Sequence, residues 1–78
     1  MKPSKYVIID QITPVIFNAP LSHKDMVKLG PVTSAGYFLL DEGKVVLVGH
    51  AFTLAVPNGE HDGMLLERVL NDLSAVHG

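Results

Sequence analysis

The chain contains no cysteine and no tryptophan among its 78 residues. Without cysteine it has neither a disulfide framework nor a thiolate metal site, and it has no cysteine nucleophile. Its stability must therefore come from packing alone. Residues 1–78 form one domain at most. A domain of this size buries only about 60% of the surface that its unfolded chain exposes.

Charge is also scarce, because charged residues make up 18% of the chain against about 25% in an average protein. The net charge of −2 at pH 7 offers no long-range attraction to nucleic-acid phosphates or anionic lipids. No stretch approaches the roughly 20 apolar residues of a membrane helix, and Asp10 ends the apolar run at residues 6–9 before it has the length of a signal sequence. We therefore expect a cytoplasmic protein that binds neither nucleic acid nor a membrane.

Apolar side chains are abundant instead, at 47% of the chain. This content excludes disorder of the whole chain. It also exceeds what the core of so small a domain easily hides, so apolar surface should remain exposed. We expect that surface to be covered in a homo-oligomer, most simply a dimer, or by another protein.

Short runs of β-branched and aromatic residues predict two strands near the start of the chain, at residues 5–10 and 15–18. Pro14 lacks an amide donor, so the second strand is placed after it. A short helix is predicted next, at residues 22–29, with Ser22 as its N-cap.

Two further strands, at residues 33–40 and 44–56, are joined by Asp41-Glu42-Gly43 in a predicted three-residue loop. Pairing Leu40 with Lys44 places Phe38 opposite Val46 and Ser34 opposite His50. Gly49 is expected to mark a bulge.

An amphipathic helix is predicted at residues 64–76, because apolar side chains recur there at helical spacing. The fold class is therefore α+β, a small and mainly antiparallel sheet with the order β-β-α-β-β-α. The last helix packs on one face of the sheet. The other face lacks an obvious cover unless the helix at residues 22–29 supplies it, and a second copy of the sheet is the simplest remedy.

The spacing of the polar residues gives little support for a metal site. No two of the four histidines lie one helical turn apart, as an HExxH zinc motif requires, and only Glu60-His61-Asp62 groups ligand types locally. The histidines are His23, His50, His61 and His77.

A calcium loop is also disfavoured. Asn58, Glu60 and Asp62 before Gly63 resemble the first half of such a loop, but Val69 stands where a bidentate glutamate is needed. Acidic residues that precede a helix are explained by capping and by the helix dipole. We therefore expect no metal and no cofactor.

The stretch Thr33-Ser34-Ala35-Gly36 has two interpretations. Ser34 opposite His50 suggests a nucleophile with its base, although no third member of a triad is identifiable. Alternatively, small residues in a row let another backbone or chain approach closely, which is the interpretation we prefer. The candidate interface or ligand residues are His23, Ser34, Gly36, Tyr37 and His50.

Three short motifs carry a resemblance: Pro14-Val15-Ile16-Phe17, His23-Lys24-Asp25 and Thr33-Ser34-Ala35-Gly36. Over about two thirds of its length, the chain resembles small uncharacterised proteins of phages and prophages, a group with no assigned activity. The resemblance implies no catalytic residue, and it singles out His23 and residues 34–36 as the first positions to mutate.

The function expected from the sequence is that of a self-associating interaction or assembly module without catalysis. Its interface is the sheet face that the last helix leaves open. The alternative is a small-ligand or metal-binding protein, or a small hydrolase, built around His50 and Ser34.

Overall fold

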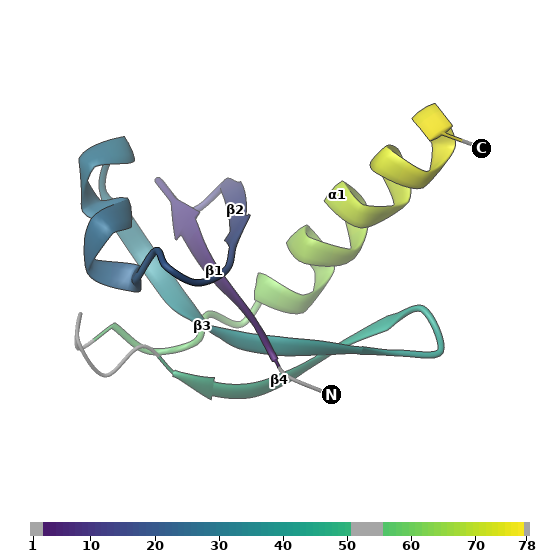
Figure 1. Cartoon of the computed structure of the whole chain (residues 1–78), viewed down its shortest axis with the longest axis horizontal. Helices are drawn as coiled ribbons and strands as arrows, with labels where there is room; N and C mark the ends of the chain where they lie inside the picture. Colours follow the sequence, from purple (N-terminus) through teal and green to yellow (C-terminus); the bar gives the residue numbers. More distant parts are fainter. Residues whose placement is uncertain (1–2, 51–55, 78) are drawn as a thin grey trace.

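The computed structural model describes residues 3–50 and 56–77 of the chain. Its four-stranded sheet is antiparallel throughout, with the strand order β2-β1-β3-β4, and a helix follows the last strand (Figure 1). The α+β class and the antiparallel sheet are thus confirmed. The elements are β1 (Ser4–Ile9), β2 (Thr13–Phe17), the 3-10 helix η1 (His23–Leu29), β3 (Val32–Asp41), β4 (Lys44–His50) and α1 (Asp62–His77).

The predicted element order is wrong at its third member, which is a 3-10 helix and not an α-helix. Ser22 is its N-cap, as predicted, and its backbone N–H donates to the Asp25 carboxylate at 2.8 Å. This bond, together with the Ser22 hydroxyl, lowers the pKa of Asp25 from its ordinary value. The Asp25 N–H in turn bonds the Ser22 carbonyl three residues back, which is the pattern of a 3-10 turn.

Strand β2 starts at Thr13, two residues before its predicted start. Pro14 lies inside the strand, opposite Ile8 of β1. A proline is tolerated there because β2 is an edge strand, and an edge strand bonds a neighbour on one side only.

The β3–β4 hairpin has a different turn from the predicted one. Asp41 pairs with Lys44, so the loop has two residues, Glu42 and Gly43, with φ of 52° and 83°. Two residues with positive φ make a type I′ turn, whose twist matches that of the strands. The predicted register is therefore wrong by one residue: Phe38 lies opposite Leu47, not Val46.

Beyond the turn, the pairing skips Val48, so the bulge lies beside the predicted Gly49. The predicted continuation of β4 over residues 51–55 lies outside the described residues. Helix α1 begins at Asp62, two residues before its predicted start.

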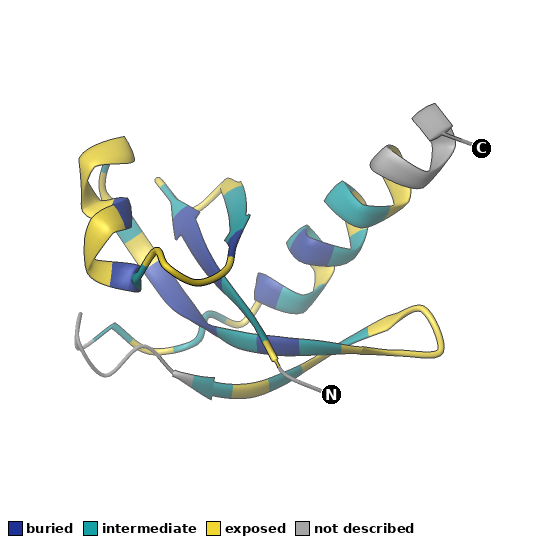
Figure 2. Ribbon diagram, viewed as in Figure 1, coloured by how far each residue is buried: buried dark blue, intermediate teal, exposed yellow. Residues whose placement is uncertain are grey.

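Buried residues lie along β1 and β3, at the end of β2 and on both helices (Figure 2), and they form one core layer on each face of the sheet. On the α1 side, Leu66 packs with Tyr6, Ile8 and Phe38. On the η1 side, the buried cluster consists of Val7, Phe17, Met26 and Ala35. Each helix therefore covers one face, as the alternation of side chains along a strand requires. Within the described residues, no helix has the length and apolar character to cross a membrane.

Candidate functional site

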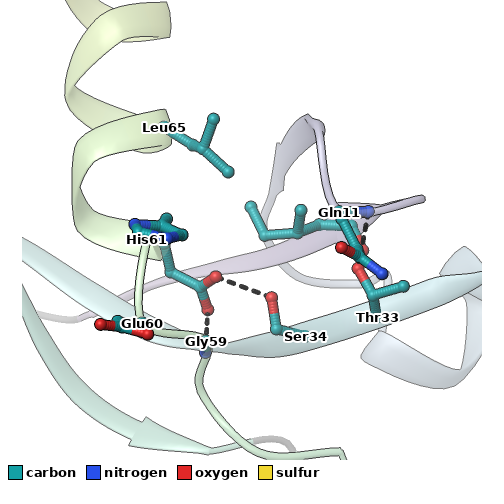
Figure 3. A pocket seen from close by; sticks show the side chains of 9 residues that line it. Gln11, Thr33, Ser34, Gly59, Glu60, His61 and Leu65 are labelled. Carbon is teal, nitrogen blue, oxygen red and sulfur yellow. Dashed lines mark hydrogen bonds between the residues drawn. The ribbon is translucent and has the colours of Figure 1, made fainter.

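A buried carboxylate, that of Asp62, ties the start of α1 to the sheet. Asp62 is 2% exposed. Its Oδ1 accepts a hydrogen bond from the Ser34 hydroxyl at 2.7 Å, and its Oδ2 accepts one from the Gly59 amide at 2.7 Å (Figure 3). The Tyr6 hydroxyl also donates to Oδ2, at 2.5 Å. Three bonds to one buried carboxylate fix the first turn of α1 against β1 and β3.

The side chain of Asn58 extends this network to β4. Its Nδ2 lies 2.9 Å from the Ala35 carbonyl oxygen, 3.0 Å from the Gly49 carbonyl oxygen and 3.2 Å from the Tyr6 hydroxyl, to all of which it donates. The loop before α1 is thereby bound to three strands. We name the group formed by Tyr6, Ser34, Asn58, Gly59 and Asp62 the Asp62 network.

Gly36 is a glycine because the Asp62 network lies directly against it. A Cβ at this position would overlap Nδ2 of Asn58 and the carbonyl oxygen of Gly49. The sequence suggested that the small residues 34–36 let another backbone or chain approach closely. In the structure, Ser34, Ala35 and Gly36 are buried, and the chain's own loop makes that approach.

Burial and the hydrogen bond to Asp62 raise the pKa of Tyr6 well above its ordinary value of 10. The folded protein therefore holds the phenol proton more tightly than the unfolded chain does. This contribution to stability is complete below pH 10 and is lost as the pH rises above 10, by up to about 1.4 kcal/mol per pH unit.

We expect urea unfolding to show this alkaline loss of stability in the wild type and in Tyr37→Phe, but not in Tyr6→Phe. Equal slopes in all three would contradict the assignment.

A cavity of about 190 Å³ opens beside the Asp62 network (Figure 3). Ile8 and Leu65 contribute apolar walls, and Gln11, Ser34, His61 and Asp62 contribute polar ones. Its volume is below the 300–1,000 Å³ or so of typical ligand pockets. The cavity therefore has room for a small molecule only.

The predicted pairing of Ser34 with His50 is wrong. Along β3, the residue opposite His50 is Gly36, and Ser34 lies opposite Ile8 of β1. The Ser34 hydroxyl donates its hydrogen bond to Asp62, which also accepts bonds from Tyr6 and Gly59. Among the side chains that the structure describes, no imidazole accepts a hydrogen bond from Ser34, so this serine lacks the base that activates a nucleophile.

The side chain of His23 is buried between two aromatic rings. Its ring packs edge-on against Phe17, at 5.1 Å between centroids, and against Tyr37, at 5.0 Å. Its Nε2 lies 2.8 Å from the Gly36 carbonyl oxygen, close enough for a hydrogen bond. These contacts anchor η1 to the sheet. Of the candidate residues from the sequence, the structure thus brings His23, Gly36 and Tyr37 together, with Ser34 on the opposite face.

No metal site is formed by the residues that the structure describes: nowhere among them do three His, Asp or Glu side chains gather closely enough. The oxygens of Asp62 already accept bonds from three donors, and Glu60 and His61 are exposed. Of the stretch 58–63 that resembles half of a calcium loop, Asn58, Gly59 and Asp62 belong to the Asp62 network, in agreement with the expectation that no calcium loop forms there.

Sequence reasoning missed most of this network. It treated Asn58 and Asp62 as capping groups, and Asp62 does accept the Gly59 amide three residues back. The bonds from Tyr6 and Ser34 span 56 and 28 residues. No local pattern predicts contacts over such separations.

A second candidate site is the uncovered end of the sheet. Helix η1 lies at the opposite end from the β3–β4 turn (Figure 1). Leu39 and its partner Val46 lie on the η1 side of the sheet, and Val46 is 44% exposed. Val48, the next valine along β4, is 45% exposed. We call Leu39 and Val46, together with Val48, the exposed extra residue of the bulge, the open face.

No family model, curated protein or solved structure matches the chain. The resemblance to phage and prophage proteins therefore stays a prediction.

Proposed function

We propose that the protein is a non-catalytic assembly module whose partner is a second copy of itself, and that the two copies pack through the open face. The observation that carries the proposal is the exposure of branched apolar side chains on one half of the sheet, Val46 and Val48 among them. Polar residues at the β3–β4 turn border this half at one end: Asp41, Glu42 and Lys44 are all exposed. An apolar centre within a polar rim is typical of a protein–protein interface.

The amount of surface supports a dimer. The accessible surface of the chain is 5298 Å². A compact monomer of this mass has about 4,600 Å². The difference of about 700 Å² is close to the roughly 800 Å² that each partner buries in an interface of standard size. A second copy with the same apolar face matches the character of the exposed side chains, and the total excess of surface leaves room for an interface of this size.

Light scattering on a size-exclusion column, over a wide range of protein concentration, tests the proposal. We expect a dimer, and we expect Val46→Thr to weaken it by at least about 30-fold. This substitution keeps the shape and strand preference of valine, but it places two unpaired hydroxyls in each interface, at about 1–3 kcal/mol each.

Val27→Thr is the matched control, because Val27 is 49% exposed on η1 and lies outside the open face. It should leave the dimer unchanged. A wild type that is monomeric at every concentration would overturn the proposal, as would equal weakening by both substitutions. A cytoplasmic location belongs to the same proposal, and cell fractionation tests it.

A further inference from the structure

Among residues 3–50 and 56–77, the two outer strands of the sheet pair on one side only, and an unpaired edge readily recruits a strand from another copy of the chain. β2 is five residues long and includes Pro14, which has no N–H to offer a further strand. β4 has no proline between Lys44 and His50. The β4 edge therefore lacks the protection that a proline gives, and another group can supply it.

That group is the side chain of Glu67 on α1. Its Oε2 accepts a hydrogen bond from the backbone N–H of Val45 at 3.2 Å. In an antiparallel ladder, the N–H and C=O of one residue point to the same side, and successive residues alternate. The Val45 N–H therefore points away from β3 and toward the free edge, and so does the N–H of Leu47.

Only a short part of the edge is regular enough to pair with another strand. The turn ends at Lys44, and Val48 is the extra residue of the bulge. Between these two points, the outward donors belong to Val45 and Leu47. Glu67 occupies one of the two, and an incoming strand would have to displace its carboxylate.

We infer that Glu67 closes the β4 edge against the β4 strand of a second copy, and that it thereby stops assembly at the dimer. The closure of the edge by Glu67 is independent of the proposed function. The statement that assembly stops at the dimer rests on the proposed function. An open face and an open edge would be two different interfaces on one chain. Two such interfaces let copies join into chains beyond a closed dimer.

Light scattering on the wild type and three variants distinguishes the open-face interface from the β4-edge interface. The wild type is expected to be a dimer, and Glu67→Ala is expected to form larger species, with a mass at least about twofold higher at the highest concentration. Val46→Thr is expected to be mainly monomeric. The double variant Val46→Thr/Glu67→Ala is expected to dimerise again, through the β4 edges.

Two controls keep the interpretation specific. Glu67→Gln keeps an acceptor oxygen at the same place, so it should behave as the wild type. Arg68→Ala removes an exposed neighbour on the same helix and should also leave the mass unchanged. Circular dichroism verifies that each variant is folded.

Amide hydrogen exchange supplies an independent readout at low concentration, where edge pairing is negligible. The Val45 amide should exchange about tenfold faster in Glu67→Ala than in the wild type, and Glu67→Gln should retain the protection. Unchanged exchange at Val45, or a Glu67→Ala protein with the wild-type mass at all concentrations, would overturn the inference. If the wild type itself is monomeric, the proposed function fails, and dimerisation of Glu67→Ala alone would still support the closure of the edge.

Discussion

Replacing Asp62 with alanine is expected to lower the free energy of unfolding by about 3–5 kcal/mol. The substitution leaves the Tyr6 hydroxyl, the Ser34 hydroxyl and the Gly59 amide without their acceptor. A buried donor without a partner costs about 1–3 kcal/mol, and the loss of a charged partner lies at the upper end of this range. Because small domains are stable by only about 5–15 kcal/mol, most of the stability would be lost.

The melting temperature should fall by at least about 12 °C, since each kcal/mol corresponds to about 4–8 °C in a domain of this size. Circular dichroism measures the melting temperature. The wild type and the variants are compared at the same protein concentration, because self-association raises the melting temperature with concentration. Asp62→Asn keeps one acceptor oxygen and should cost less. Glu60→Ala removes the exposed neighbouring carboxylate and should cost almost nothing. Equal effects of Asp62→Ala and Glu60→Ala would show that the network contributes little.

Truncation of Leu66 to alanine is expected to cost about 3 kcal/mol. The side chain is fully buried and packs between α1 and the sheet, against Tyr6, Ile8 and Phe38. Large-to-small substitutions in a core remove the transfer free energy of the lost carbons and leave a cavity, at about 2–5 kcal/mol for leucine. Urea unfolding measures the change.

Met64 provides the matched control on the same helix. It is 55% exposed, and leucine, methionine and alanine are all good helix formers. Met64→Ala should therefore change the free energy of unfolding by less than about 0.5 kcal/mol. If both substitutions cost the same, α1 does not pack on the sheet through Leu66.

The two sites have different roles. The Asp62 network centres on a buried carboxylate, and among the described residues no buried side-chain polar atom lacks a hydrogen-bond partner, so the network holds the loop before α1 in place. The open face is apolar and exposed, and Glu67 protects the strand edge beside it. In the proposed assembly, the first site maintains the fold and the second binds the other copy.

Much of the fold followed from local residue patterns. Runs such as residues 6–9 predicted β1, Ser22 predicted the start of η1, and apolar spacing predicted α1. These features depend on backbone preferences and on the alternation or helical periodicity of neighbouring side chains, which are properties of short segments. The sequence left the second sheet face uncovered unless the helix at residues 22–29 supplied the cover, and η1 does cover part of it through Met26, with Val46 and Val48 left exposed.

Other features required the tertiary structure. The type I′ turn at Glu42-Gly43 shifted the register by one residue at Phe38, and the bulge at Val48 shifted it by a second residue at His50. The small choice between a two-residue and a three-residue loop changes every pair that follows. Composition near the turn does not determine that choice.

The sequence by itself determined the class of the fold, the segments that form it and the excess of apolar surface. Only the tertiary structure decided that Asp62 bonds Tyr6 and Ser34, that Asn58 fills the space beside Gly36, and that Glu67 occupies the edge of β4. The physical reason is the range of the interactions. Local propensities act over a few residues, whereas hydrogen bonds between buried side chains depend on which distant segments the packed sheet and helix bring together.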